Sequence, residues 1–228
     1  MRTTANKREI ENFTSLADKW WDETGPMKPL HALNPVRLRI LKGWIGEVKG
    51  KTILDVGCGG GIVCEPLARM GAKVTGIDAG QENIDAAKAH AVQSGLSITY
   101  KATTAEDYKG QFDVVLALEI IEHVEDPALF VQSLIKLAKP KGLIILSTIN
   151  RNAKAFALAK VAAEYILGWV PRGTHDFNKF RKPSEIAEWL DGKAKITYMR
   201  GMTFDPLRGE FAESADVDVN YFICAVKS

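Results

Sequence analysis

The sequence has almost no net charge for a chain of its length. It contains 30 Lys and Arg residues and 28 Asp and Glu residues among 228, so its formal net charge is +2. Proteins whose main partner is nucleic acid carry a basic surface, which shows as a strong excess of positive charge. Because that excess is absent, nucleic acid is not an expected partner.

Cysteine is scarce, and the cysteines do not pair in sequence. The chain has three, Cys58, Cys64 and Cys224, and they form no C-x-x-C motif. An odd number at such spacings is typical of a protein of the reducing cytosol and not of a secreted disulfide framework. Cys58 lies within a glycine-rich loop, where we interpret it as a small residue whose backbone matters, in preference to a reactive thiol.

Long apolar runs are also missing. No stretch approaches the roughly 18 to 20 apolar residues that span a bilayer. The first residues, M-R-T-T-A-N-K-R-E, lack the apolar segment of a secretory signal. Hydrophobic residues make up 46% of the chain, which is long enough for one domain with a sizeable core. We therefore expect a single cytoplasmic domain.

What the sequence does contain is an organising stretch at residues 51–65, K-T-I-L-D-V-G-C-G-G-G-I-V-C-E. Its short, apolar, β-branched segment Thr52–Val56 predicts a buried parallel strand. Four glycines follow between positions 57 and 61, and helical spacing resumes at Ile62. Strand, glycine loop and helix open a doubly wound sheet at a nucleotide site, because the ligand touches backbone there and the turn needs unusual φ and ψ angles.

Acidic residues indicate which nucleotide this loop binds. The dinucleotide pattern G-x-G-x-x-G/A, counted from Gly57, fails at Ile62. Asp55 places a carboxylate that would repel a pyrophosphate and attract an ammonium group. Asp78 ends the next predicted strand, placed to accept hydrogen bonds from ribose hydroxyls. The segment from Asp55 to Gly59, D-V-G-C-G, followed by Asp78, resembles motifs I and II of class I methyltransferases that use S-adenosyl-L-methionine (SAM), so SAM is the expected cofactor.

The rest of the chain alternates strands and helices. We expect strands at 73–78, 97–101, 112–118, 142–148, 197–204 and 220–226, and helices at 6–22, 36–48, 82–93, 127–137 and 152–170. This order predicts an α/β fold with a Rossmann-like, seven-stranded, mostly parallel sheet, the layout of class I methyltransferases. The expected parts are an N-terminal helical cap (1–48), a SAM-binding core (49–150), a substrate- or membrane-facing insertion with an amphipathic helix after strand five (151–190), and a terminal hairpin (191–228).

Chemistry is expected where strand 112–118 ends, because ligands bind beyond the carboxyl ends of parallel strands. Glu119, Glu122 and His123 follow there in L-E-I-I-E-H-V-E-D-P. On a helix, spacings of three and four share a face, and two carboxylates with one imidazole can bind Mg²⁺ or Zn²⁺. Two other interpretations stay open. Acids in a first helical turn are stabilised by the helix dipole, and His123 can serve as a general base without metal.

Longer segments carry a closer resemblance. They are W-W-D-E-T-G-P-M-K-P-L-H-A-L-N-P-V-R, L-D-V-G-C-G-G-G-I, L-E-I-I-E-H-V-E-D-P, S-T-I-N-R-N, A-E-Y-I-L-G-W-V-P-R-G-T-H-D and V-D-V-N-Y. Together, from Trp20 to Tyr221, they resemble the ubiquinone-biosynthesis O-methyltransferase family. The sequence K-P-K-G at 139–142, where many methyltransferases have P-G-G, departs from the pattern only in a turn.

The resemblance implies particular site residues. Cofactor contacts are implied at Arg37, Gly57, Asp78 and Leu118. A divalent metal, Mg²⁺ first, is implied at Glu119, Glu122 and His123. The segment T-T-A-E-D is where class I methyltransferases hold the adenine, which makes Ala105 and Glu106 the candidates. Arg37 could grip the methionine carboxylate bidentately, although a solvated surface arginine fits the sequence equally well.

The implied reaction is SAM-dependent O-methylation of polyprenylated phenols and catechols, including 3-demethylubiquinol, in both O-methylation steps of ubiquinone biosynthesis. Glu119, His123 and His175 are the catalytic candidates, with hydrogen bonding of His175 to Asp176 as its structural alternative. The competing functions are methylation of a soluble phenol or acid, and SAM binding by a non-catalytic scaffold subunit. An NAD-dependent oxidoreductase is disfavoured by Ile62 and Asp55.

Residues 152–170 predict a helix with an unusually broad apolar surface. Basic residues flank it at Arg151, Lys154, Lys160, Arg172, Lys179, Arg181 and Lys182. Such a helix can lie in a membrane interface, where each basic residue adds about 1 kcal/mol near an anionic surface. A cover over the active site or a dimer contact fits the same pattern. Peripheral contact with anionic lipids of the inner membrane, and with other quinone-biosynthesis enzymes, is the corresponding expectation.

Overall fold

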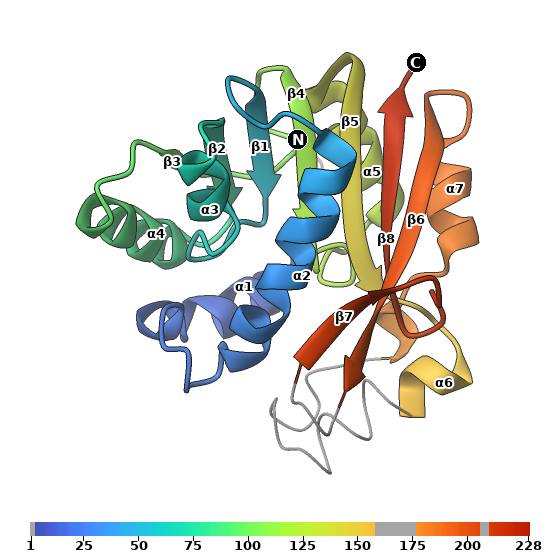
Figure 1. The fold of residues 1–228 in the computed structure, drawn as a ribbon, viewed down its shortest axis with the longest axis horizontal. Coiled ribbons are helices and arrows are strands. Elements are labelled where there is room, and N and C mark those ends of the chain that lie inside the picture. Colours follow the sequence, from blue (N-terminus) through green and yellow to red (C-terminus); the bar gives the residue numbers. More distant parts are fainter. Residues whose placement is uncertain (1–2, 158–176, 206–209) are drawn as a thin grey trace.

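Aliphatic and β-branched segments form one mixed sheet in the computed structural model of the chain, which describes residues 3–157, 177–205 and 210–228 (Figure 1). The first five strands are β1 (Thr52–Val56), β2 (Lys73–Asp78), β3 (Thr99–Ala102), β4 (Phe112–Leu118) and β5 (Ala138–Ile149). The last three are β6 (Ala194–Asp205), β7 (Glu210–Ser214) and β8 (Asn220–Lys227). Their order across the sheet is β3-β2-β1-β4-β5-β8-β6-β7.

The strand directions bring the ligand-binding ends of the sheet together. Strands β1 to β5 pair in parallel, whereas β8 is antiparallel to both β5 and β6. In this register Asp55 of β1 lies beside Gly76 of β2 and Leu116 of β4. The carboxyl ends of β1, β2 and β4 therefore meet at one edge, as the sequence predicts for an α/β fold with a Rossmann-like sheet.

In the described residues the sheet has eight strands, one more than the seven that we expect from the sequence. The additional strand is β7, which pairs antiparallel with the end of β6 and brings Phe211 opposite Phe204, with ring centroids 5.0 Å apart. This edge strand is mostly exposed and reads E-F-A-E-S, so no run of apolar residues marks it. The periodic signal on which strand prediction depends is therefore weak there.

Helices cover both faces of the sheet and create two cores. On one face, α2 (Lys28–Ile45), α3 (Cys64–Arg69) and α4 (Gln81–Gln93) pack on one set of strand residues. On the other face, α5 (Pro127–Leu137) and α7 (Pro183–Leu190) pack on the alternate set. Neighbours such as Ile53 and Leu54, or Val114 and Val115, divide between the two cores, because side chains alternate across a strand. In Figure 1, α2 crosses in front of the sheet and α5 lies behind it.

The helix boundaries near the N-terminus differ from those expected. Residues 6–22 form α1 (Lys7–Thr14) and a short 3₁₀ turn, η1 (Ala17–Lys19), instead of one helix. Helix α2 begins earlier than position 36, with Pro29 in its first turn, where the missing N–H is not needed, and it continues through Pro35. Of the expected helix at 152–170, the structure describes α6 (Ala153–Ala155), and residues 158–170 lie outside the described part.

Of the N-terminal cap expected at 1–48, α2 packs on the core, and the name cap is kept from here on for the described residues 3–27, which lie at the carboxyl ends of β1 and β4. Helix α1 and η1 pack against α4, and Figure 1 places them beside the lower end of the sheet. The cap is also tied to the core, because Glu125 N–H donates to Thr4 O (2.9 Å) and Thr4 Oγ1 donates to Glu106 Oε1 (2.7 Å). No helix in the described ranges is both long and apolar enough to cross a bilayer.

Candidate functional site

The glycine loop is a tight turn at the end of β1. Gly57 and Gly59 have φ angles of +73° and +51°, which favour glycine. Gly57 N–H donates to Ile77 O (2.8 Å), so the loop is anchored to β2. A Cβ on Gly57 would lie 2.7 Å from the side chain of Ile120. Both predicted glycines therefore stand at positions that a side chain could not occupy without strain.

Asp78 organises this loop from the end of β2. Its carboxylate accepts hydrogen bonds from Gly59 N (3.0 Å), Gly80 N (2.8 Å) and Asn83 Nδ2 (3.1 Å). Burial raises the pKa of Asp78, and these three donors partly oppose the increase. A carboxylate offers about four acceptor positions, so one remains for a ribose hydroxyl.

Asp55 and Arg37 lie in the interior beside the loop. Burial raises the pKa of Asp55 to about 6, against the opposing effects of the Cys64 thiol, which donates to it at 3.3 Å, and of the Arg37 charge. Arg37 is 4% exposed, and its Nε and Nη2 have no hydrogen-bond partner. Burial lowers the pKa of Arg37, whereas the carboxylates of Glu119, Asp55 and Glu122 raise it. The interpretation of Arg37 as a solvated surface residue is therefore wrong.

A buried arginine with donors that no protein atom accepts favours a ligand site, because an unpaired buried charge carries a large desolvation penalty. The missing partner must be an acceptor that fits a planar guanidinium, and a carboxylate does so. The methionine carboxylate of SAM is such a group. The residues around the loop thus fit the expected cofactor, with Asp55 for its ammonium group and Arg37 for its carboxylate.

The cap closes over the glycine loop through two tryptophans. Trp20 donates from Nε1 to Asn83 Oδ1 (2.9 Å), and Trp21 donates from Nε1 to Gly60 O (3.0 Å). A Cβ on Gly59 or Gly60 would lie 2.2 or 2.4 Å from Trp20. The loop therefore has room for the cap as well as for a ligand because it lacks side chains.

The residues predicted to contact the adenine follow β3, and Leu118 stands at the end of β4. Ala105 is buried, and the neighbouring Glu106 holds Thr4 of the cap with Oε1, while its buried Oε2 has no partner. Leu118 is the last residue of β4. Glu119 follows with a φ angle of +54°, a conformation that is uncommon for a non-glycine residue and often marks a functional site.

Two carboxylates follow β4 and are held by β5. Glu119 Oε1 accepts from Ser147 Oγ (2.6 Å), and Glu122 Oε2 accepts from Thr148 Oγ1 (2.8 Å). Burial and the charge of Glu122 raise the pKa of Glu119, and the Arg37 charge opposes them. Sequence reasoning did not identify Ser147 and Thr148, because adjacent hydroxyl residues at the end of a buried strand are also an ordinary feature of a core.

His123 is held by the cap. Its Nδ1 lies 3.1 Å from Glu9 Oε2, and its ring meets the ring of Phe13 edge-on, with centroids 5.1 Å apart. Burial lowers the pKa of His123, but the Glu9 hydrogen bond and the charges of Glu122 and Glu9 together raise it above its ordinary value. Glu9 was not a sequence candidate. The backbone N–H of Glu9 donates to the side chain of Asn6, which caps α1. In the sequence, Glu9 is therefore typical of an acid in the first turn of a capped helix.

The predicted metal set of Glu119, Glu122 and His123 does not form. Residues 119–126 are turns and not a helix, and α5 begins only at Pro127, so the expected shared face is absent. Each side chain contacts a different residue: Glu119 contacts Ser147, Glu122 contacts Thr148, and His123 contacts Glu9. In the described part of the chain, no group of three or more His, Cys, Asp and Glu side chains could hold a metal ion. The structure therefore does not support the expectation of Mg²⁺. His175 lies outside the described residues.

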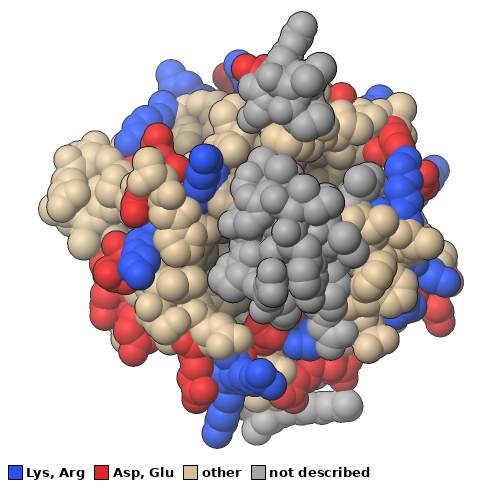
Figure 2. Space-filling model, turned by 90° about the horizontal axis from the view of Figure 1, so that it is seen from below, with Lys and Arg blue, Asp and Glu red and all other residues tan. Residues whose placement is uncertain are grey.

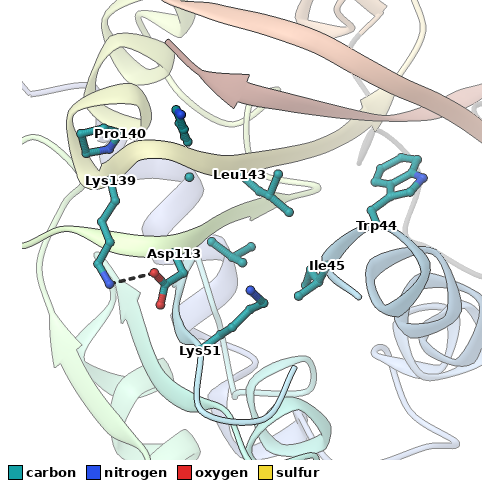
Figure 3. Close-up of a pocket in the computed structure, with 10 residues that line it drawn as sticks. Trp44, Ile45, Lys51, Asp113, Lys139, Pro140 and Leu143 are labelled. Carbon is teal, nitrogen blue, oxygen red and sulfur yellow. Dashed lines mark hydrogen bonds and ion pairs between the residues drawn. The ribbon is translucent and has the colours of Figure 1, made fainter. Parts of the chain in front are cut away.

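A separate hollow of about 360 Å³ lies at the opposite edge of the sheet (Figure 3). It is lined by the end of α2 with Trp44, by Lys51 just before β1, and by the starts of β4 and β5 with Leu143. An ion pair between Lys139 Nζ and Asp113 Oδ1 (2.8 Å) crosses one side of it. Because it lies at the amino ends of the parallel strands, it is not part of the candidate site.

We predict that the native thiols do not react with alkylating agents. Cys58, Cys64 and Cys224 are buried and unpaired, and burial raises the pKa of Cys58 to about 11. At pH 8 only about one Cys58 in a thousand would be a thiolate. Iodoacetamide labelling followed by mass spectrometry should find no modification in the folded protein and three in urea. Rapid labelling of the folded protein would contradict this.

Comparisons with known proteins identify the family of the chain. A model of the methyltransferase domain matches residues 31–193. A ubiquinone biosynthesis O-methyltransferase from Bartonella bacilliformis is 46% identical over 97% of this chain and 96% of its own. One from Proteus mirabilis is 44% identical over 98% and 93%. A solved structure, magnesium protoporphyrin IX methyltransferase from Synechocystis PCC 6803 with bound SAM, matches 100% of both chains with a TM-score of 0.69 at 20% identity, which shows a shared fold. The chain therefore belongs to the ubiquinone biosynthesis O-methyltransferase family.

Proposed function

We propose that the protein transfers the methyl group of SAM to a phenolic oxygen of polyprenylated phenols and catechols, in both O-methylation steps of ubiquinone biosynthesis. The observation that carries the proposal is Arg37, a buried guanidinium with two unpartnered nitrogens beside Asp55 and the glycine loop. The relatives from Bartonella bacilliformis and Proteus mirabilis are named ubiquinone biosynthesis O-methyltransferases.

Different residues bind different parts of the cofactor. Arg37 holds the carboxylate and Asp55 the ammonium group. Gly57 and Gly59 offer backbone without steric obstruction, and Asp78 accepts from the ribose. Ala105 and Leu118 contact the adenine and its surroundings. When bound, SAM supplies a methyl group already activated by positive sulfur.

His123 is the base in this proposal. A phenol with a pKa near 10 is about one-thousandth ionised at pH 7, so forming the phenoxide costs roughly 4 kcal/mol. A positioned imidazole removes the proton as the new bond forms, which contributes about 10²- to 10⁴-fold in rate. Glu119 and Glu122 add negative charge next to Arg37 and favour a cationic ligand. Since these residues do not form a metal site, no step is assigned to a metal.

The competing functions differ in measurable ways. A methyltransferase for soluble phenols would turn over catechols with and without a prenyl chain equally well. A scaffold subunit would bind SAM and transfer nothing. Preference for prenylated substrates, together with turnover, separates the proposed function from both.

Peripheral membrane contact stays a proposal. Within the described ranges, three of the flanking basic residues form ion pairs with acids: Arg151 with Glu185, Lys154 with Asp216 and Lys179 with Glu9. Figure 2 shows the molecule from below, and the described residues on this side carry interspersed acidic and basic side chains. These pairs reduce the positive charge available to anionic lipids.

The decisive experiment is transfer of labelled methyl from SAM to a short-chain polyprenyl catechol, with Mg²⁺ and with EDTA. We expect turnover in both conditions, within about twofold, because the acids and His123 have protein partners instead of a shared metal position. An unprenylated catechol is the matched substrate control. Absence of turnover with SAM still bound would contradict the proposed function, and loss in EDTA that Mg²⁺ restores would contradict the assignment of no metal step.

A further inference from the structure

Trp20 of the cap is connected to the carboxylate of Asp78 through one buried amide. Its Nε1–H donates to Asn83 Oδ1 (2.9 Å), and Asn83 Nδ2 donates to Asp78 Oδ1 (3.1 Å). Trp20 is 7% exposed and Asn83 is 2% exposed, so water does not compete for the bond between them. The cap is therefore linked, through Asn83, to the group that the proposed function assigns to the ribose of the cofactor.

The two hydrogen bonds of the Asn83 amide fix its orientation from both ends. An indole nitrogen only donates, so the amide oxygen must face Trp20, and the NH₂ group then faces the carboxylate of Asp78. Without the indole, Asn83 Oδ1 would be a buried acceptor with no partner, which is costly. The side chain would then be driven away from this position, and Nδ2 would leave Asp78. Trp20 thus keeps Asn83 in the position where it donates to Asp78.

This arrangement determines which oxygen of Asp78 is available to a ligand. Oδ1 accepts from Asn83 Nδ2 and from Gly80 N (2.8 Å), which together use its two lone pairs. Among the described residues, Oδ2 accepts from Gly59 N alone (3.0 Å), so it keeps one lone pair. A ribose hydroxyl that donates to Asp78 must therefore approach Oδ2, beside the glycine loop.

We propose that Trp20 is a positioning residue for cofactor recognition, which holds Asn83 so that Asp78 presents Oδ2 to one ribose hydroxyl. The inference rests on the proposed function, in which Asp78 accepts from the ribose of SAM. It gives the cap a part in selecting the ligand, in addition to covering the glycine loop. A ligand that lacks this hydroxyl leaves a buried acceptor unpaired and binds more weakly.

The test compares ligands that differ by one hydroxyl. S-adenosylhomocysteine and its 2′-deoxy and 3′-deoxy analogues are titrated into the native protein by calorimetry. We expect one of the two analogues to bind about 10-fold or more weakly than the parent, because a hydrogen bond to a charged group is lost. The dissociation constant of that analogue divided by that of the parent, here called the hydroxyl ratio, measures the contact with Asp78.

Trp20→Phe should lower the hydroxyl ratio at least about threefold, because the ligand must then order the carboxylate that the native protein holds ready. Phenylalanine keeps a ring over the glycine loop but has no donor for Asn83. Asn83→Leu breaks the same connection at its other end and should lower the ratio equally, which tests the inference even if one variant does not fold. The two changes together should have no further effect on the ratio, because Trp20 acts through Asn83.

Trp21→Phe is the matched control within the cap. It removes the hydrogen bond from Trp21 Nε1 to Gly60 O but leaves the connection from Trp20 to Asp78 intact. A cap that is only loosened should bind the parent and the analogue more weakly by the same factor. The hydroxyl ratio of Trp21→Phe should therefore stay native.

The outcomes separate this inference from the proposed function. A native hydroxyl ratio in Trp20→Phe or in Asn83→Leu would overturn the positioning role while leaving SAM binding and methyl transfer in place. An equal fall in Trp21→Phe would overturn it as well, since any loosening of the cap would then suffice. If neither analogue binds the native protein more weakly than the parent, the role of Trp20 is overturned together with the ribose contact of Asp78. A native protein that shows the ratio but methylates no phenol would contradict the proposed reaction and leave the role of Trp20 standing.

Discussion

Replacing His123 with alanine is expected to lower kcat for phenol methylation by about 10²- to 10⁴-fold, the contribution of a general base. His123 lies beyond β4 beside Glu122 and is oriented by Glu9. It is not among the residues proposed to hold SAM, so SAM affinity measured by calorimetry should stay within about twofold of the native value. Rapid-quench measurement of a single turnover reports the chemical step directly.

The need for a base should depend on the acidity of the substrate, which supplies the control. A nitro-substituted catechol ionises much more readily, so the ratio of native to His123→Ala rates should shrink with it. The native rate should also fall with decreasing pH, because a protonated ring cannot accept a proton. Since the pKa of His123 is raised, this loss should begin above the ordinary histidine value near 6.5. Equal losses for both catechols would exclude His123 as the base.

The second large effect is expected at Arg37. Arg37→Met should weaken SAM binding about 100-fold, within the roughly 2 to 5 kcal/mol that follows removal of one partner of a buried charge pair. Two nitrogens of this buried guanidinium have no protein partner, so its hydrogen bonds are available to a ligand carboxylate. Arg37→Lys should restore affinity only in part, because an ammonium cannot grip a carboxylate bidentately.

Ligands that differ at one end make this prediction specific. S-adenosylhomocysteine carries the same carboxylate and should lose affinity in parallel with SAM. Methylthioadenosine lacks the amino-acid end and should bind Arg37→Met as it binds the native protein. The exposed Arg39→Met is the matched control on the same helix and should behave as native. Equal weakening of methylthioadenosine would mean that Arg37 supports the site only structurally.

Much of the fold and part of the site follow from local pattern. Short β-branched runs predict β1, β2 and β4, and the glycines after β1 predict a backbone-lined site at the carboxyl edge. Asp55 and Asp78 are identifiable because they occupy strand ends, and parallel strands bring those ends together. These inferences need only the periods of strands and helices and the chirality of the chain.

The metal prediction is not supported within the described residues, because it assumed a helix that does not form there. Spacings of three and four place Glu119, Glu122 and His123 on one face only if residues 119–126 are helical, and they are turns. In turns, each side chain follows its own backbone direction. Ser147 and Thr148 of β5 donate hydrogen bonds to Glu119 and Glu122, and Glu9 contacts the ring of His123. None of these partners is near in sequence.

The sequence by itself determined an α/β sheet, a glycine loop for SAM, and acids at two strand ends, because short-range periodicity and backbone sterics govern those features. Only the tertiary structure decided that Arg37 is buried with free donors, that Trp20 closes on Gly59 and Gly60, and that Glu9 holds His123. The contact of Trp20 with Asn83 spans 63 positions and that of Glu9 with His123 spans 114. Such contacts form because the cap must bury its aromatic face on the core, and which side chains then meet depends on packing and not on local pattern.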